Sequence, residues 1–230
     1  MQLTPEFPQF EAEWAAGRNQ LVTIRLAADL DTPVSLMLKL AEAAPQSFML
    51  ESVTGGELRG RYSIVGMKPD LVWECRDGQA RINRQARFSQ DFEDDTRPAL
   101  DSLRALIAES RIDAMPEGVP PVAAGLFGYL GYDMIRLVED LPDVNPDPLD
   151  LPDAMMMRPS VVAVLDGVKG EVTLCAPAWQ DGTDNARAAY ARAAERVMDA
   201  LRSLDRQPSE PRVMGDDTQI GAPVSNFAKP

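Results

Sequence analysis

The sequence predicts an α+β fold built on mostly antiparallel sheet, with hairpins and packed helices. Three observations lead to this fold class. Apolar and polar residues alternate in short segments, as expected for strands that are half-buried. Asp77-Gly78 stands between two such segments as a typical two-residue hairpin turn. Helical patterns are interspersed irregularly, which argues against the regular βαβ units of a parallel sheet.

The first element is a helix that begins near Thr32-Pro33 and ends before Pro45. The Thr32 hydroxyl can cap the helix, and Pro33 suits the first turn because its missing N–H would be unpaired there. The apolar residues whose helical spacing predicts the buried face are Val34, Met37, Leu38 and Ala41.

Four strands follow the first helix. Residues 47–53 and 61–67 are expected to pair around a turn at Thr54-Gly55-Gly56. Residues 70–76 and 80–84 form the hairpin around Asp77-Gly78. Cys75 shares a strand face with Leu71 and Trp73, so a core thiol is expected there, although a disulfide with Cys175 stays open.

The middle of the chain mixes one helix with less regular segments. The helix is expected over residues 98–109, and its inward residues are Leu100, Leu103 and Ile107. Residues 122–132 are apolar and punctuated by glycine, which indicates a central strand whose glycines mark bulges or close backbone contact. Residues 140–159 are rich in Pro and Asp and are expected to form a long loop excursion. A second hairpin joins residues 160–165 to 171–176.

The clearest helix covers residues 184–204. Its predicted inward stripe consists of Tyr190, Ala193, Ala194, Val197, Met198, Leu201 and Leu204. Residues 206–230 are polar, contain proline and lack periodicity. We therefore expect one α+β domain over residues 1–205 and a linker over residues 206–230.

Composition excludes several classes of function. Hydrophobic residues make up 45% and charged residues 26%, which is ordinary for a soluble globular protein. The net charge of −13 argues against nucleic-acid and anionic-membrane partners. The chain has no histidine, which excludes Ser-His-Asp and Cys-His nucleophiles and His-based zinc sites. The first residues lack the basic and apolar regions of a signal peptide, so a cytoplasmic location is expected.

Two weak motifs are better explained as loops. The segment from Gly55 to Gly60 has the glycine spacing of a phosphate-binding loop, but Arg61 and Tyr62 replace the required Lys and Ser/Thr. A run of acids lacks the ligand spacing of a calcium loop and is expected to be a solvated segment without a metal. These acids are Asp140, Asp143, Asp147, Asp150 and Asp153.

Glu51-Ser52 is the most informative dipeptide. It sits in an otherwise apolar strand, where an inward-facing carboxylate would be costly without a partner. One hypothesis is a glutamate at the sheet edge that stays in water. The other is a glutamate that receives a ligand ammonium, beside a serine that hydrogen-bonds the same ligand.

Two blocks of sequence carry a family resemblance. Met49-Leu50-Glu51-Ser52 followed by residues 60–66, and later residues 125–133, resemble the N-terminal region of anthranilate synthase component I. Aminodeoxychorismate synthase component I carries related motifs and is the second hypothesis. A third is a stand-alone module that binds a small molecule or a protein.

The resemblance implies a lyase of tryptophan biosynthesis that converts chorismate to anthranilate and pyruvate. Its partner is a glutamine amidotransferase subunit, component II, which supplies ammonia, and its cofactor is magnesium (Mg2+). Catalytic residues and metal ligands belong to a C-terminal chorismate-binding domain, toward which residues 206–230 would lead. We therefore expect a truncated fragment that is inactive alone, with no catalytic residue, metal or cofactor.

The resemblance also implies a feedback site for L-tryptophan. The inhibitor-binding Leu-Leu-Glu-Ser motif of the family maps onto Met49, Leu50, Glu51 and Ser52, with Met49 in place of the first leucine. The glutamate is expected to pair with the ligand ammonium and the serine to hydrogen-bond its polar end. Arg61, or alternatively Arg59, is expected to meet the ligand carboxylate.

Overall fold

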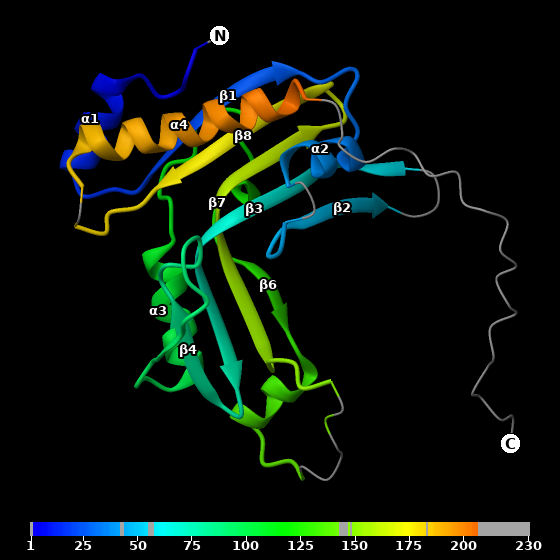
Figure 1. Ribbon diagram of the computed structural model, residues 1–230, viewed down its shortest axis with the longest axis vertical. Helices are drawn as coiled ribbons and strands as arrows, with labels where there is room; N and C mark the ends of the chain where they lie inside the picture. Colours follow the sequence, from blue (N-terminus) through cyan, green and yellow to red (C-terminus); the bar gives the residue numbers. More distant parts are fainter. Residues whose placement is uncertain are drawn as a thin grey trace, which may run out of the picture.

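The computed structural model describes residues 2–41, 44–54, 58–142, 147, 149–182 and 184–206, and only the backbone of residues 52–54, 58 and 59. Within these residues eight strands form one sheet in the order β1-β8-β7-β3-β4-β5, with β2 beside β3 and β6 beside β7. Each strand pair is antiparallel. The predicted α+β class with mostly antiparallel sheet is confirmed (Figure 1).

The helices are α1 (Phe7–Ala15), α2 (Pro33–Leu40), α3 (Ala99–Glu109) and α4 (Ala186–Leu204), with short 3₁₀ turns η1 (Pro121–Ala123) and η2 (Tyr132–Leu137). The strands are β1 (Gln20–Ala27), β2 (Phe48–Thr54), β3 (Leu58–Arg76), β4 (Gln79–Asn83), β5 (Glu93–Asp94), β6 (Phe127–Leu130), β7 (Ala154–Asp166) and β8 (Glu171–Ala178).

Two long strands, β3 and β7, run through the narrow middle of the molecule and join its two halves (Figure 1). The two separate strands expected over residues 61–67 and 70–76 are wrong, because β3 continues through both. Its register with β7 shifts between Pro69 and Leu71. Such an irregularity accommodates proline, which has no N–H to donate to a ladder. The loop excursion expected over 140–159 also ends earlier, since β7 begins at Ala154.

The upper part of the sheet, called the upper sheet below, consists of β1, β2, β8 and the halves of β3 and β7 that pair with them. Helices α1, α2 and α4 cover one face of it (Figure 1). Helix α2 begins as predicted: the Ser35 N–H donates to Thr32 Oγ1 at 3.1 Å, and the Thr32 N–H donates to Ser35 Oγ at 2.9 Å. Its predicted buried stripe is wrong in part. Leu36 and Leu40 are buried with Ala41, whereas two members of the predicted stripe, Val34 and Leu38, are 55% and 40% exposed.

The lower half has its own core between α3, β3 and β4. Its buried side chains are Leu71, Trp73, Cys75, Ala80, Ile82, Ala99, Leu103, Leu106, Met134 and Ala154. The Asp77-Gly78 hairpin is confirmed, with φ of 48° and 76° at its two residues. Ile107 was expected inside but is 55% exposed, and Leu106 takes the inward position. Cys75 and Cys175 are both buried free thiols, which answers the open disulfide question.

The central strand expected over residues 122–132 is wrong. The segment holds only the four-residue β6, which pairs with β7 in the lower half, between two 3₁₀ turns. The expected role of its glycines is confirmed at two positions. A Cβ on Gly128 would lie 1.8 Å from the Met155 carbonyl oxygen, and one on Gly131 would lie 2.6 Å from that of Asp153.

Helix α4 lies along the sheet and begins where the Asn185 side chain accepts the Ala188 N–H at 2.9 Å. Its buried residues are Ala189, Ala193, Val197, Ala200 and Leu204, so three members of the predicted stripe are confirmed as buried. No helix in the described part of the chain is long and apolar enough to cross a membrane.

Candidate functional site

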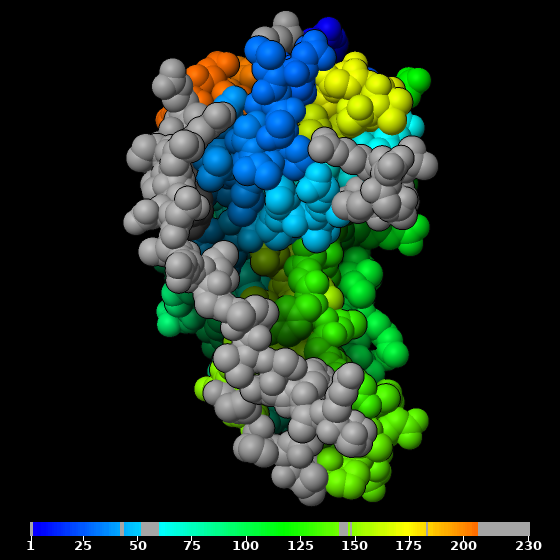
Figure 2. Space-filling view, turned by 90° about the vertical axis from the view of Figure 1, so that its right-hand side faces the viewer, coloured from blue at the N-terminus to red at the C-terminus, as the bar shows by residue number. Residues whose placement is uncertain are grey.

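The predicted ligand-binding motif lies on β2, at the edge of the upper sheet. Figure 2 faces this edge, with α2 and the first part of β2 in blue on the surface turned toward the viewer. Met49 stands opposite Val65, Leu50 opposite Ile64, and Glu51 opposite Ser63. Because side chains alternate along a strand, Met49 and Glu51 share one face while Leu50 occupies the other.

The start of β2 is anchored by packing on both faces. The Phe48 ring stacks on the Phe127 ring with 4.5 Å between centroids. It also fills the space beside Gly66, where a Cβ would lie 2.2 Å from the Phe48 ring. Met49 packs, partly buried, against the core beneath the helices. Packing of Phe48 and Met49 thus holds the first residues of β2 in place, whereas Leu50, which follows them, is 47% exposed.

Glu51 is exposed, so the inward-facing carboxylate considered from the sequence is wrong. Among the described residues no ion pair involves Glu51, and its position is that of a glutamate at the sheet edge. The register of β2 on β3 shifts between Glu51 and Val53. A bulge at that point changes the direction of the following side chains. The side chain of Ser52 lies outside the described residues, so its predicted ligand contact stays a prediction.

Arg61 is engaged with Asp166 at the end of β7. Its Nη2 lies 2.8 Å from Asp166 Oδ2, and its Nε donates to the same carboxylate. The guanidinium also lies 4.9 Å from the centroid of the Tyr62 ring. The hydrogen bond from Arg61 is the main cause that lowers the pKa of Asp166, which also accepts the N–H groups of Val168 and Lys169.

The structure does not join the predicted site residues by direct contacts. Within the described residues no hydrogen bond or ion pair connects Arg61 to Met49, Leu50 or Glu51. Nη1 of Arg61 makes no hydrogen bond there either, and the side chain is 47% exposed. The alternative cation, Arg59, has its side chain outside the described residues, as does the glycine segment at 55–57.

The part of the chain that the structure describes contains no cluster of side chains suited to a metal ion. No group of three or more Cys, Asp or Glu side chains comes together there in a way that could hold an ion. The described residues therefore do not fit the magnesium that the family resemblance implies for a full-length enzyme, and no chemical step of this chain is assigned to it.

Sequence reasoning missed a separate, arginine-lined cavity. It has a volume of about 590 Å³ and lies between α4, the end of β8 and the segment after β4. Arg192 and Arg196 from α4 both line it. They are four residues apart and are therefore neighbours on the helix surface. This spacing is the feature of the sequence that could have indicated a cluster of positive charge. The sequence shows them only as part of the polar face of α4.

The chain is similar to curated proteins over most of its length. It is 68% identical over 222 residues to anthranilate synthase component 1 of Cereibacter sphaeroides, which covers 96% of this chain and 44% of that protein. It is 37% identical over 204 residues to anthranilate synthase component 1 of Pseudomonas aeruginosa, which covers 86% of this chain and 39% of that protein. The chain thus spans less than half the length of these relatives.

The chain was also compared with solved structures and with protein-family models. The solved structure of anthranilate synthase component I from Streptococcus pneumoniae TIGR4 aligns with 78% of this chain and 37% of its own, at 20% identity and a TM-score of 0.49. No protein-family model matches the chain. The sequence identities and the motifs on β2 and β3 agree, and the chain belongs to the anthranilate synthase component 1 family and corresponds to its N-terminal region.

Proposed function

We propose that this chain is the tryptophan-sensing part of an anthranilate synthase large subunit. The observation that carries the proposal is the 68% identity over 222 residues to a protein of that name. In the longer protein the reaction is the conversion of chorismate to anthranilate and pyruvate, in the biosynthesis of tryptophan. Component II, a glutamine amidotransferase, supplies ammonia. Magnesium is held by the C-terminal chorismate-binding domain of the longer protein, and the enzyme acts in the cytoplasm.

The end of β2 supplies groups that suit an amino-acid ligand. Glu51 is exposed and has no cationic partner among the described residues, so it is available to an ammonium group. Leu50, 47% exposed on the other face, offers apolar surface. In the proposal Ser52 hydrogen-bonds the ligand, Met49 supports the strand from below, and Arg61 donates Nη1 to the ligand carboxylate while keeping its pair with Asp166.

Feedback inhibition requires that the ligand distinguish two conformations of the enzyme. A ligand shifts an equilibrium only by its difference in affinity for the two states. The groups on β2 line one side of the proposed site. Contacts from the rest of the longer protein complete the site. The affinity for the ligand therefore depends on how this chain and the rest of the protein are arranged.

The first test uses the longer protein. We expect Glu51→Gln and Ser52→Ala each to raise the tryptophan concentration for half-inhibition at least tenfold, because each removes a polar contact of the ligand. The matched control is Glu93→Gln, since Glu93 is an exposed strand glutamate in the other half of the molecule. Unchanged inhibition in both β2 variants would place the tryptophan site elsewhere.

The second test uses the 230-residue chain alone. Calorimetry is expected to show weak or no tryptophan binding, because only one side of the site is present. Micromolar binding that is lost in Ser52→Ala would show that the site is self-contained. Anthranilate formation by the chain alone would overturn the assignment of catalysis to the rest of the protein, and aminodeoxychorismate formation by the longer protein would favour the second hypothesis.

A further inference from the structure

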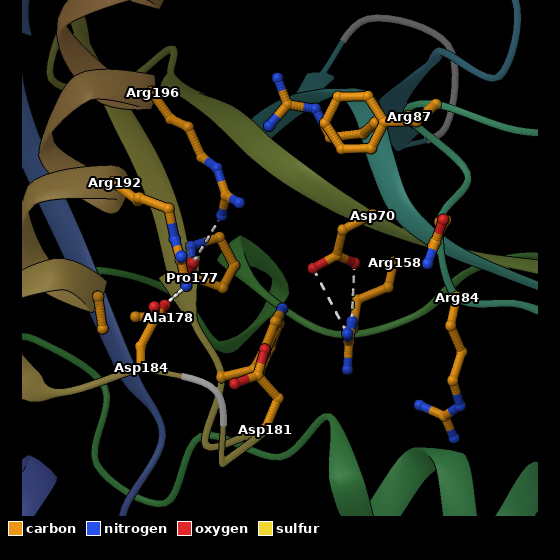
Figure 3. A pocket seen from close by; sticks show the side chains of 14 residues that line it. Asp70, Arg84, Arg87, Arg158, Pro177, Ala178, Asp181, Asp184, Arg192 and Arg196 are labelled. Carbon is orange, nitrogen blue, oxygen red and sulfur yellow. Dashed lines mark hydrogen bonds and ion pairs between the residues drawn. The ribbon is translucent and has the colours of Figure 1, made fainter.

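The arginine-lined cavity is assembled from four parts of the fold. Figure 3 shows Arg192 and Arg196 reaching down from α4, with Asp70 and Arg158 beside each other on the sheet and Arg84 farther along. The volume of about 590 Å³ is typical of a small-molecule pocket. The cavity is distinct from the end of β2, so a ligand bound in it is independent of the proposed function.

The residues that line the cavity carry a net positive charge, although the protein as a whole is acidic. Five arginines line it against three aspartates, a surplus of two positive charges, whereas the whole chain carries −13. The lining charges are Arg84, Arg87, Arg158, Arg192 and Arg196 with Asp70, Asp181 and Asp184. Glu109, which stands outside the lining, pairs with Arg84 at 2.8 Å and with Arg158 at 3.1 Å.

Three of the arginines have carboxylate partners. Arg158, which is only 7% exposed, donates to Asp70 at 2.9 Å and also pairs with Glu109. Arg84 pairs with Glu109, and Arg192 pairs with Asp184. These ion pairs hold the wall of the cavity in place. With Glu109 counted, five arginines face four carboxylates, and Arg87 and Arg196 stand outside the ion pairs of the described residues.

Arg196 and Arg87 are the cations without a carboxylate. In the described part of the chain neither forms an ion pair. Arg196 is half-buried, and its Nη1 donates to the neutral Pro177 carbonyl at 3.3 Å. Burial lowers the pKa of Arg196; the charge of Asp70 raises it again in part, and the charges of Arg87, Arg192 and Arg158 lower it. A partly desolvated guanidinium beside other guanidiniums, with no carboxylate in direct contact among the described residues, favours an added counter-charge.

Trp179, another residue that lines the cavity, carries a buried donor without an acceptor in the described part of the chain. The residue is 8% exposed and lines the cavity, and its Nε1–H finds no acceptor among the described residues. Its ring also lies 4.8 Å from the Arg158 guanidinium, which fixes its position. Buried donors are normally hydrogen-bonded, so an acceptor oxygen at this position would satisfy the indole.

We propose that this cavity binds a small organic dianion, either a phosphate monoester or a dicarboxylate. Two negative charges match the two unpaired guanidiniums of Arg87 and Arg196, and one anionic oxygen accepts the Trp179 N–H. Guanidinium groups bind both phosphates and carboxylates in this way. The volume exceeds that of a bare phosphate, and Phe88 and Pro177 supply apolar wall for the organic part.

The test measures binding of two probes to the 230-residue chain, inorganic phosphate and malonate, at constant ionic strength set with NaCl. Calorimetry and tryptophan fluorescence are the readouts, because Trp179 lines the cavity. We expect saturable binding of at least one probe and at least a tenfold loss in Arg196→Gln. The control is Arg202→Gln, on the same helix, whose side chain is 67% exposed and pairs with Asp199.

The two probes separate the two sources of the anion. Binding of phosphate alone assigns a phosphate monoester, and binding of malonate alone assigns a dicarboxylate. Arg196→Lys keeps the charge and is expected to retain part of the affinity, while Trp179→Phe is expected to lower affinity and to remove the fluorescence change.

Three results would overturn the proposal. The first is the absence of saturable binding by either probe beyond the effect of NaCl. The second is an equal loss of affinity in Arg196→Gln and Arg202→Gln. The third is binding to this chain that disappears in the longer protein, which would assign the cavity to a carboxylate-bearing protein segment instead.

Discussion

A buried relay of hydrogen bonds in the lower core gives the sharpest prediction about stability. The Trp73 Nε1–H donates to Ser102 Oγ at 2.9 Å, and Ser102 Oγ donates to Asp95 Oδ2 at 2.6 Å. Trp73 and Ser102 are both fully buried. Asp95 also pairs with Arg97. One serine hydroxyl thus satisfies the indole of the lower core and ties α3 to the segment after β5.

Replacing Ser102 with alanine removes both hydrogen bonds at once. A buried indole N–H without an acceptor costs about 1–3 kcal/mol, and a hydrogen bond to a carboxylate contributes about 1.5–3 kcal/mol. Asp95 keeps its pair with Arg97, so the second value falls at its lower end. Alanine is the better helix former, by about 0.5 kcal/mol. We expect the free energy of unfolding to fall by about 2–4 kcal/mol.

The assay is equilibrium unfolding in urea of Ser102→Ala, Trp73→Phe and the double variant. Trp73→Phe already removes the donor, so adding Ser102→Ala should cost at least about 1 kcal/mol less than it does in the native background. The control is Ser203→Ala, a serine of α4 whose hydroxyl donates to the Asp199 carbonyl. It should change stability by less than about 0.5 kcal/mol. Additive effects, or a loss in Ser102→Ala as small as in the control, would refute the relay.

The relay also has a pH dependence with a defined sign. The hydrogen bond from Arg97 is the main cause that holds the pKa of Asp95 well below its usual range, and Ser102 adds to it. A carboxyl with a depressed folded-state pKa stabilises the fold above its unfolded pKa of about 4, and this is lost as pH falls through the folded-state value. The stability difference between native protein and Ser102→Ala should therefore narrow below about pH 4.

Two further predictions concern other strand contacts. Asp166→Asn should lower the melting temperature at pH 7, because Arg61 holds the pKa of Asp166 down, and the deficit should shrink when the same melts are recorded below about pH 4. Gly128→Ala should lower the free energy of unfolding in urea by about 2 kcal/mol or more, because its Cβ would meet the Met155 carbonyl. Gly167→Ala, with ordinary contacts, is the control, and equal losses would contradict the argument.

Local signals in the sequence were sufficient where a few neighbouring residues determine the structure. Thr32 and Ser35 close a capping box, and Asp77-Gly78 closes a hairpin. Neither depends on distant parts of the chain. The buried face of α2 could not be predicted in the same way, because this short helix is apolar on several sides. Only the sheet beneath it selects Leu36 and Leu40 over Val34 and Leu38.

Features that depend on pairing between distant segments could not be predicted from the sequence, because neighbouring residues do not show which strands will pair. Pro69 separates two strand patterns in the sequence, yet β3 passes through it because a register shift relieves the missing N–H. Glycines within residues 122–132 resemble a central strand, but they permit close backbone contact at a short strand in the lower half. For the candidate site, the sequence placed Glu51 on a strand and left open a glutamate in water at the sheet edge or one that receives a ligand; the structure shows it exposed on β2, which pairs with β3 alone among the described strands.

The acidity of the chain and its basic cavity are compatible because they act over different distances. At physiological ionic strength a charge is screened beyond about 8 Å. A long polyanion such as a nucleic acid would extend across the surface and meet a chain with net charge −13, which opposes its binding. A small dianion held in the cavity lies within a few ångströms of Arg196 and Arg87, where the local surplus outweighs the distant negative charge. The net charge thus opposes an extended polyanion, while the arginines of the cavity favour a small anion.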